Sequence, residues 1–325
     1  MEPPEQPKVA YVLGVYRSGT TLLSNLMGQL DGFFCVGELR AIWRELGLAT
    51  ARCGCGMPLG ACETWQHILG SAYGGMVEAR KLAPQMLSWQ RQALREKHTW
   101  QRVPALLRHR QLGSIDESAR RYAGGMADLY RAIARVTEAR VIVDSSKEPT
   151  DAAMIRLLPA MSAYFIQIVR DPRGTVFSAM RARAGGQLPP GSHWARSGYT
   201  AMSWMAGNFA AAAVCRVHGP ERSMRIRYED LVQMPDLTLE RIAQLVGEPV
   251  EVPMSQDGSM VMAPTHTVCG NENRFRVGPV HLAQDTAWRN NLRPLARYVT
   301  TAVCAPLMIS YGYQLNPGWR RYGSS

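Results

Sequence analysis

Residues 14–21 read Gly-Val-Tyr-Arg-Ser-Gly-Thr-Thr, a glycine-bounded loop of the form GxxxxG followed by two threonines. An apolar run rich in β-branched residues precedes it over residues 9–15, as expected for a buried parallel strand. The apolar residues that follow the loop share one helical face: Leu22, Leu23, Leu26, Met27 and Leu30. Strand, loop and helix together predict a phosphate loop, in which backbone N–H groups and the helix dipole face an anion.

Thr20 stands where a nucleotide triphosphatase carries lysine. That lysine reaches the β and γ phosphates, so its absence argues against ATP. The loop has Arg17 instead, and we expect it to hold a different phosphorylated group, with a phosphosulfate as the leading candidate. An ordinary glycine turn in a βα unit is the plainer interpretation, and the flanking strand and helix disfavour it.

The composition indicates a large folded chain. It has 325 residues, of which 46% are hydrophobic, and no evident linker divides it. We therefore expect one domain over residues 1–325, with a helical and loop insertion at about 45–138. The net charge of +11 is compatible with an anionic ligand, and no dense basic block favours nucleic acid.

The N-terminal segment, the apolar runs and the cysteines indicate in which cellular compartment the protein is expected. The N-terminus shows no secretory signal, and no run of 18 apolar residues predicts a membrane span. An odd number of cysteines, seven, does not suggest a disulfide scaffold. We expect a reduced, cytoplasmic protein.

A second short strand over residues 141–144 ends in Ser-Ser-Lys-Glu-Pro. Ligands of open α/β sheets collect at the carboxyl ends of strands, so Lys147 is expected to meet the phosphorylated ligand. A kinase would instead use Asp144, together with Thr21, to hold Mg²⁺.

A third apolar strand, residues 164–169, runs into Arg170, and a serine follows eight residues later at Ser178. A guanidinium fork and a hydroxyl both suit a phosphate dianion. This pair resembles the 3′-phosphate-binding element of sulfotransferases that use 3′-phosphoadenosine 5′-phosphosulfate. The loop at residues 14–21 resembles their 5′-phosphosulfate-binding element.

Two further stretches extend the resemblance to about residues 9–288. Tyr228 lies in the sequence Arg-Tyr-Glu-Asp-Leu, which is similar to the Tyr-Glu-Asp-Leu that ends a later strand in these sulfotransferases. The resemblance implies that Tyr228 contacts the adenosine. Residues 266–275 resemble the late loop that closes over the nucleotide. There Gly270 and Asn271 suit a turn, and Arg274 suits the 3′-phosphate.

The resemblance implies a P-loop α/β fold with a central parallel sheet flanked by helices. It also implies sulfuryl transfer from 3′-phosphoadenosine 5′-phosphosulfate to a hydroxyl of a small acceptor: a phenol, lipid, sugar or natural product. No metal is expected to be required. The residues assigned to the 5′-phosphosulfate are Arg17, Ser18, Gly19, Thr20 and Thr21, and Lys147 and Arg17 are expected to neutralise the leaving oxygen. A P-loop kinase and a noncatalytic nucleotide-fold protein remain the alternatives.

Glu38 is the predicted general base. It follows a short apolar strand, residues 33–37, and relatives with a carboxylate base carry a glutamate at a similar position. An ion pair with Arg40 or Arg44 is the alternative role for this carboxylate. Histidine could serve as the base instead, and the candidates are His67, His193 and, best placed of the three, His266.

Cys53, Cys55 and Cys62 form a glycine-rich loop that, with His67, could bind zinc. Their spacing is not a strong zinc pattern, so reduced thiols or a local disulfide are preferred and no metal site is predicted. The helical insertion and residues 185–199 are expected to wall the acceptor pocket, because they match no donor motif. Their methionines and aromatic residues favour a largely apolar acceptor with one hydroxyl.

Overall fold

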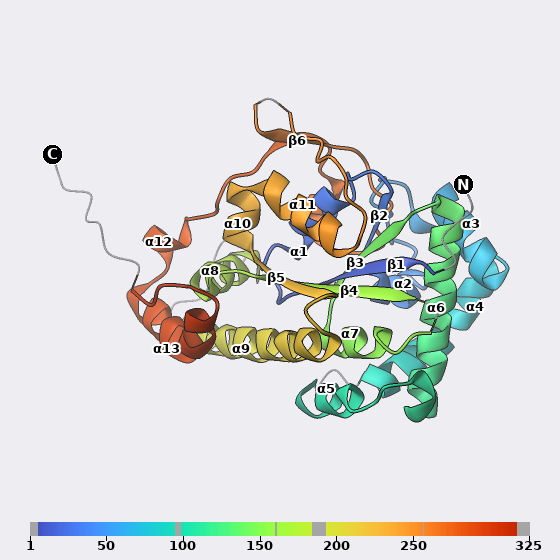
Figure 1. Cartoon of the computed structure of the whole chain (residues 1–325), viewed down its shortest axis with the longest axis horizontal. Helices are drawn as coiled ribbons and strands as arrows, with labels where there is room; N and C mark the ends of the chain where they lie inside the picture. The colour runs from blue at the N-terminus through green and yellow to red at the C-terminus, as the bar shows by residue number, and fades with distance from the viewer. Residues whose placement is uncertain (1–5, 95–98, 160, 184–192, 256, 317–325) are drawn as a thin grey trace. The chain divides into compact units, whose positions relative to one another are not determined.

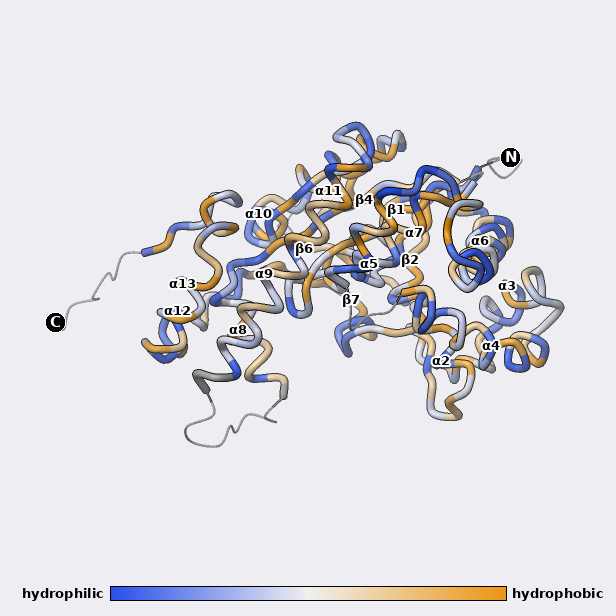
Figure 2. The backbone as a smooth tube through the Cα atoms, turned by 90° about the horizontal axis from the view of Figure 1, so that it is seen from below, coloured by the Kyte–Doolittle hydropathy of each residue, from blue (hydrophilic) through white to orange (hydrophobic). Residues whose placement is uncertain are grey.

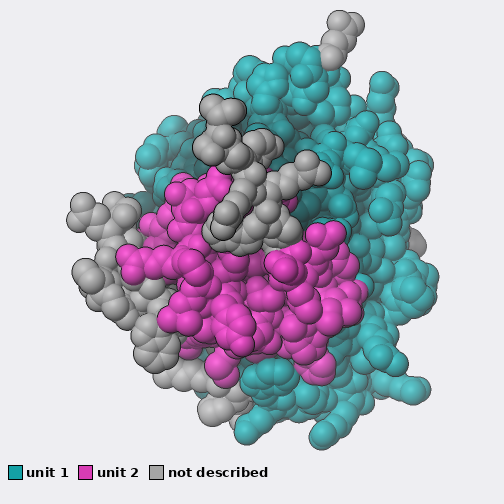
Figure 3. Space-filling view, turned by 90° about the vertical axis from the view of Figure 1, so that its left-hand side faces the viewer, with its two compact units in different colours: residues 1–14, 18–169, 210–284 teal, residues 15–17, 170–209, 285–325 magenta. Residues whose placement is uncertain are grey.

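The computed structural model describes residues 6–94, 99–159, 161–183, 193–255 and 257–316. The chain divides into two compact units, coloured separately in Figure 3. Unit 1 comprises residues 1–14, 18–169 and 210–284, and unit 2 comprises residues 15–17, 170–209 and 285–325. The two units interleave along the chain, so a single domain over 1–325 stays a prediction.

Unit 1 is built on a five-stranded parallel sheet, which confirms the predicted α/β class (Figure 1). The strand order is β2-β3-β1-β4-β5. Their bounds are β1 Lys8–Leu13, β2 Phe33–Gly37, β3 Val141–Lys147, β4 Ser162–Val169 and β5 Ser223–Arg227. All their carboxyl ends therefore lie along one edge of the sheet.

Side chains alternate between the two faces of the sheet, and helices cover both. Ala10 and Val12 of β1 pack with α1 (Thr20–Met27), α10 (Tyr228–Gln233) and α11 (Pro235–Leu245). The small antiparallel pair β6 (Ser259–Met262) and β7 (Gly278–His281) joins this face. Val9, Tyr11 and Leu13 face the other layer, which includes α7 (Pro149–Ile155).

Helices occupy the predicted insertion between β2 and β3. After η1 (Leu39–Ala41), α2 (Ile42–Glu45) and η2 (Leu59–Ala61) come α3 (Glu63–Tyr73), α4 (Met76–Leu94), α5 (Thr99–Leu107), η4 (Leu112–Ser114) and α6 (Glu117–Thr137). Hydrophobic and hydrophilic stretches alternate along helices such as α4, as expected when one face is buried (Figure 2). Asp116 caps α6 by accepting a hydrogen bond from the N–H of Ala119 at 2.9 Å.

Unit 2 contains α8 (Pro172–Arg183), most of α9 (His193–His218), α12 (Trp288–Asn291) and α13 (Pro294–Ser310). Its centre holds a buried ion pair between Arg173 and Asp171 at 2.6 Å. The Arg173 guanidinium also lies 4.8 Å from the centre of the Trp288 ring. Among the described residues of the whole chain, no helix is long and apolar enough to span a membrane.

Several element boundaries differ from those expected, and three of them bear on the site. β1 ends at Leu13 rather than residue 15, because the phosphate loop begins at Gly14. α1 ends at Met27 rather than residue 30, where Gly28 caps it through its N–H to the carbonyl of Ser24. β3 extends past residue 144 and ends at Lys147, where the chain turns.

Candidate active site

The carboxyl ends of β2, β3 and β1 gather the predicted catalytic residues of unit 1. Lys147 pairs in register with Leu13, the residue before the phosphate loop, and Asp144 pairs with Gly37, the residue before Glu38. The register therefore places Glu38, Lys147 and the start of the phosphate loop along the same edge.

The phosphate loop needs both of its glycines. A Cβ on Gly14 would lie 2.7 Å from the hydroxyl of Ser18, and a Cβ on Gly19 would lie 2.7 Å from the ring of Tyr228. Gly19 also has φ 98°, in the left-handed region that favours glycine. Tyr228, predicted at the adenosine, thus packs on the loop itself.

The loop leads into a helix start suited to an anion. Ser18 and Thr20 are buried, whereas Thr21 is half-buried. Within the described residues, no side chain caps the N-terminus of α1. A helix start of this kind can offer its first-turn N–H groups to an anion. This arrangement is chemically suited to binding a phosphate or a phosphosulfate.

Glu38 and Lys147 form an ion pair. Their side chains are 24% and 15% exposed, so both can still be reached from solvent. The predicted alternative, an ion pair of Glu38 with Arg40 or Arg44, does not occur among the ion pairs of the described residues. Arg40 bonds Asp151 at 2.8 Å, and Arg44 bonds Glu45 at 2.7 Å.

Lys147 adopts φ 73°, a conformation that costs energy for a residue with a side chain. The turn is held by the N–H of Glu148, which donates to the carbonyl of Ser146 at 2.9 Å. Arg17, in unit 2, has a similar φ of 70°. Such strain at non-glycine residues is common in functional sites.

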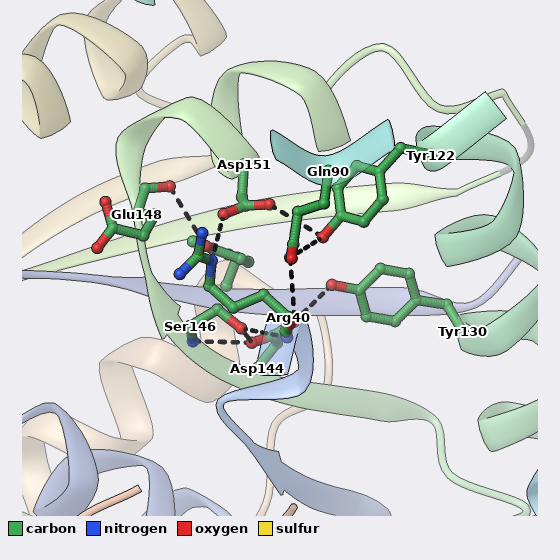
Figure 4. Close-up of polar contacts among 9 residues, drawn as sticks. Arg40, Gln90, Tyr122, Tyr130, Asp144, Ser146, Glu148 and Asp151 are labelled. Atoms are coloured by element: carbon green, nitrogen blue, oxygen red, sulfur yellow. Dashed lines mark hydrogen bonds and ion pairs between the residues drawn. The ribbon is translucent and has the colours of Figure 1, made fainter. Parts of the chain in front are cut away.

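A buried polar network supports the backbone next to Glu38 and Lys147. Figure 4 shows the side chains of this network. The N–H of Arg40, two residues after Glu38, donates to the Ser146 hydroxyl at 3.1 Å. The Gln90 amide donates to the Arg40 carbonyl and to the Tyr122 hydroxyl, each at 2.9 Å. These bonds tie the segment after β2 to the end of β3, and so hold Glu38 and Lys147 in register.

Asp144 belongs to the same network rather than to a metal site. It is 1% exposed, and its carboxylate accepts bonds from the Tyr130 hydroxyl at 2.6 Å and from the N–H of Ser146 at 2.8 Å. Burial raises the pKa of Asp144 to about 6, while the bonds from Ser146 and Tyr130 act in the opposite direction. A carboxylate committed to these buried donors is a poor Mg²⁺ ligand, which opposes the kinase alternative.

The late loop, residues 266–275, contacts the predicted base, Glu38, directly. The N–H of Glu38 donates to the Cys269 carbonyl at 3.1 Å, and the N–H of Val268 donates to the Val36 carbonyl at 2.9 Å. A Cβ on Gly37, which has φ 71°, would lie 2.6 Å from that Cys269 carbonyl. A Cβ on Gly270 would lie 3.8 Å from Glu38 Oε1, so this glycine lines the carboxylate.

Arg274 and Asn271 hold the late loop together. The Arg274 guanidinium donates to the carbonyls of Thr267 at 2.8 Å and Arg52 at 2.9 Å. Asn271 caps the short helix η5 (Glu272–Phe275) by accepting from the N–H of Asn273 at 3.1 Å. Two N–H groups of the Arg274 guanidinium therefore already donate hydrogen bonds within the protein. A contact of Arg274 with a 3′-phosphate stays a prediction and would use its remaining N–H groups.

In unit 2, Arg170 has a partner that its sequence neighbourhood did not suggest. It pairs with Asp285 at 3.0 Å and donates to the Arg17 carbonyl at 3.3 Å, while the adjacent Asp171 pairs with Arg173. The Nε of Arg17 is buried without a hydrogen-bond partner in the described part of the chain. Ser178 is half-buried on α8.

The histidine candidates separate clearly. The imidazole of His266 lies among the cysteines: its Nδ1 is 3.3 Å from Cys62 Sγ and 3.7 Å from Cys53 Sγ. His67, which the sequence suggested as their partner, is exposed on α3 and is not in the cluster. That expectation is wrong, because the late loop rather than the neighbouring helix supplies the histidine. The side chain of His193 lies outside the described residues, as do residues 184–192 of the predicted acceptor loop.

Three features of the site escaped sequence reasoning. These are the Arg40–Gln90–Tyr122 network, the Asp285 partner of Arg170, and His266 beside the cysteine loop. Each joins residues far apart in the chain, and only the cysteine loop carried a local signal.

Comparison with known proteins places this architecture in a family. The model of the Sulfotransferase family matches residues 10–252, most of the chain. The chain therefore belongs to the sulfotransferase family, and the predicted resemblance is confirmed. No curated protein sequence matches it.

Solved structures that share the fold include two sulfotransferase domains. The sulfotransferase domain of the olefin synthase of Synechococcus PCC 7002 aligns with a TM-score of 0.55 at 18% identity, covering 97% of this chain and 99% of that one. The sulfotransferase domain from the curacin biosynthetic pathway gives 0.54 at 18% identity, covering 95% and 99%. At such identity the likeness establishes the fold alone.

Proposed function

We propose that the protein transfers the sulfuryl group of 3′-phosphoadenosine 5′-phosphosulfate to a hydroxyl of a small acceptor, with Glu38 as general base. The family and the fold support sulfuryl transfer. The observation that carries the finer proposal is the Glu38–Lys147 pair on the strand edge where the phosphate loop begins.

The pair supplies the two charges that the reaction needs. The Glu38 carboxylate takes the proton of the acceptor hydroxyl as its oxygen forms the new bond to sulfur. The bond from sulfur to the bridging oxygen breaks, its electrons stay on that oxygen, and the Lys147 ammonium stabilises the charge. Protons and charge balance without a further reactant.

The ion pair brings together the two groups on which the proposed chemistry depends. Each charge stabilises the other. The two side chains therefore lie close enough to act on the same reacting centre.

The donor contacts follow the sequence motifs. In unit 1, the buried hydroxyls and the helix start at residues 18–21 are proposed for the 5′-phosphosulfate, with Tyr228, Gly270, Asn271 and Arg274 toward the nucleotide. In unit 2, Arg170 and Ser178 are proposed for the 3′-phosphate and Arg17 for the 5′ end. Asp285 would have to yield its partner Arg170 to a phosphate.

Titration calorimetry with 3′-phosphoadenosine 5′-phosphate, ADP, and ATP with Mg²⁺ tests this proposal. We expect the bisphosphate to bind at least about tenfold more tightly than ADP, because one charge-assisted contact contributes about 1.5–3 kcal/mol. We also expect that affinity to be unchanged by Mg²⁺. Preference for ATP with Mg²⁺ would favour a kinase, and failure of all three to bind would favour a noncatalytic protein.

A further inference from the structure

Four potential metal ligands converge where two distant parts of the chain meet. Cys53, Cys55 and Cys62 come from the segment before α3, and His266 comes from the late loop. The three sulfurs and one imidazole nitrogen all lie within 4.8 Å of one another. Cys53 and Cys62 are buried, and Cys55 and His266 are half-buried.

The separations match a mononuclear tetrahedral site. Zn–S bonds of about 2.3 Å and Zn–N bonds of about 2.0–2.1 Å place neighbouring ligand atoms of a tetrahedron roughly 3.5–3.8 Å apart. The Cys55 and Cys62 sulfurs are 3.9 Å apart, and His266 Nδ1 is 3.3 Å and 3.7 Å from the sulfurs of Cys62 and Cys53. A disulfide would need a sulfur separation of about 2.05 Å, so the described cysteines are free thiols.

We propose that Cys53, Cys55, Cys62 and His266 bind a structural zinc ion. Three thiolates and an imidazole are ligands that zinc prefers, and four protein ligands complete its shell without an open position for catalysis. The site is therefore separate from the sulfuryl-transfer chemistry and does not depend on the proposed donor.

The surroundings of the imidazole suit a metal on Nδ1. The opposite nitrogen, Nε2, lies 3.4 Å from the Thr64 hydroxyl, which can accept a hydrogen bond from the Nε2–H group when Nδ1 is bound to metal. The Trp65 indole donates to the His266 carbonyl at 2.8 Å, and the Phe34 ring stacks on the imidazole with 6.2 Å between ring centres. The histidine is thus oriented from three sides.

The cysteine loop is shaped for close approach to the late loop. The N–H of Gly54 donates to the Thr267 carbonyl at 2.9 Å, and a Cβ at this glycine would lie 2.7 Å from the Thr265 carbonyl. Within the loop, the N–H of Cys53 donates to the Met57 carbonyl and that of Gly56 to the Cys53 carbonyl, each at 2.9 Å. The backbone therefore presents the cysteines to His266 along a hydrogen-bonded turn.

Zinc at this position would brace the catalytic base indirectly. Three residues after His266, Cys269 accepts the N–H of Glu38 through its carbonyl. A metal that fixes His266 fixes the late loop, and the loop fixes the backbone of Glu38. His266 is then a positioning residue rather than an alternative base.

Metal content and coordination test the proposal on the whole chain, purified with reductant and without added metal or chelator. We expect about one zinc ion per chain by mass spectrometry of the elements. X-ray absorption should show three sulfur ligands at about 2.3 Å and one nitrogen at about 2.0–2.1 Å. This measurement needs no variant, so it stays decisive if substitutions impair folding.

His266→Ala and Cys62→Ser are expected to lower zinc occupancy at limiting zinc by at least roughly tenfold. His67→Ala and Cys215→Ser are the matched controls, since both residues lie outside the cluster, and they should keep full occupancy. Loss of zinc from His67→Ala alone, iron instead of zinc, or a metal-free reduced chain that takes up no zinc would each overturn the proposal. A Cys55–Cys62 disulfide found by peptide mapping of the reductant-free protein without metal would do the same.

Amide hydrogen exchange provides a second test of the proposal, one that does not depend on measuring activity. Removing the zinc with a chelator should speed amide exchange at least about tenfold in residues 265–270 and 36–38, because both segments depend on the same loop contacts. Strand β4 is the internal control and should not change. Unchanged exchange in both loop segments would show that the ion does not brace Glu38.

Discussion

At the scale of single residues, each unit has a cation in a strained backbone conformation, and in unit 1 a carboxylate lies beside it. Lys147 and Arg17 have φ values of 73° and 70°, and Glu38 pairs with the former. Strain of this kind is retained where the surrounding bonds enforce it, and here Ser146 and Glu148 close the Lys147 turn. This turn restricts the direction in which the Lys147 side chain leaves the backbone.

Lys147→Ala should lower kcat by roughly 10²–10³, because the charge on the leaving oxygen would lose its stabilising ammonium. The affinity for 3′-phosphoadenosine 5′-phosphate should change less than about threefold, since the variant removes an interaction made mainly in the transition state. Steady-state kinetics and calorimetry measure the two effects. Lys81→Ala is the control, as Lys81 is exposed and pairs only on the surface with Glu78. Equal losses in turnover and affinity would contradict this role.

Glu38→Gln should lower kcat by roughly 10²–10⁴ while binding of the bisphosphate persists, because glutamine cannot accept the acceptor proton. Rate measurements at saturating donor with any acceptor that the protein turns over provide the comparison. Glu78→Gln, on the exposed face of α4, should retain full activity. A fully active Glu38→Gln protein would return the role of base to a histidine.

At the scale of elements, strand ends and one loop form the proposed donor side, and a buried hydrogen-bond network supports the neighbouring backbone. Tyr228, at the start of α10, covers the phosphate loop at Gly19, and the Arg40–Gln90–Tyr122 bonds connect the segment after β2 with α4 and α6. Buried polar groups of this kind are costly if any partner is lost. Changes in these elements should therefore affect the site without touching the substrate.

Gly19→Ala should weaken bisphosphate binding by at least about tenfold and lower stability. The new methyl group would clash with Tyr228 at 2.7 Å, and alanine at φ 98° is strained by roughly 1–2 kcal/mol. Calorimetry and urea unfolding report the two effects. Gly124→Ala on α6 is the matched control, because nothing lies within 4 Å of its Cβ position and its helix should tolerate or prefer alanine. Wild-type binding by Gly19→Ala would argue against this loop as the anion site.

The raised pKa of Asp144 predicts that the free energy of unfolding falls as pH rises. Its folded pKa of about 6 exceeds the ordinary 3.8, so the folded state binds more protons than the unfolded state between about pH 4 and pH 6. Stability contributed by the protonated carboxyl is therefore lost as pH rises through this window, by up to about 3 kcal/mol.

Urea unfolding of the wild type and of Asp144→Asn at intervals from pH 4 to pH 7 measures this contribution. The difference in unfolding free energy between the two proteins should change by about 3 kcal/mol across the window and level off above it. Asp128→Asn on the surface of α6 should run parallel to the wild type. Parallel curves for Asp144→Asn would show that this carboxyl does not titrate in the window.

At the scale of the whole molecule, the net charge of +11 acts on any anionic ligand that approaches. The field of surplus Lys and Arg raises association rates of anions and is screened by salt. The screening length falls from about 10 Å at 0.1 M to about 3 Å at 1 M ionic strength.

The association rate constant of 3′-phosphoadenosine 5′-phosphate should therefore fall severalfold as salt rises over this range, with a smaller change in dissociation. Stopped-flow binding at several salt concentrations provides both constants. Uncharged adenosine serves as the control ligand, and its association should be insensitive to salt. An effect confined to the dissociation rate would place the electrostatics in the bound complex rather than in approach.

The sequence by itself determined the α/β class, the phosphate loop and the strand edge that carries Glu38 and Lys147. These are local features, since glycine spacing, β-branched runs and chain order constrain the backbone before any distant contact forms. Only the tertiary structure decided that His266 joins the cysteines, that Asp285 pairs with Arg170, and that Asp144 is bonded to Tyr130. The first two pairings join side chains far apart in the chain, 204 residues between Cys62 and His266 and 115 between Arg170 and Asp285. Tyr130 and Asp144 are only 14 residues apart, but they lie on a helix and a strand that meet through packing. No local preference of the chain selects such partners.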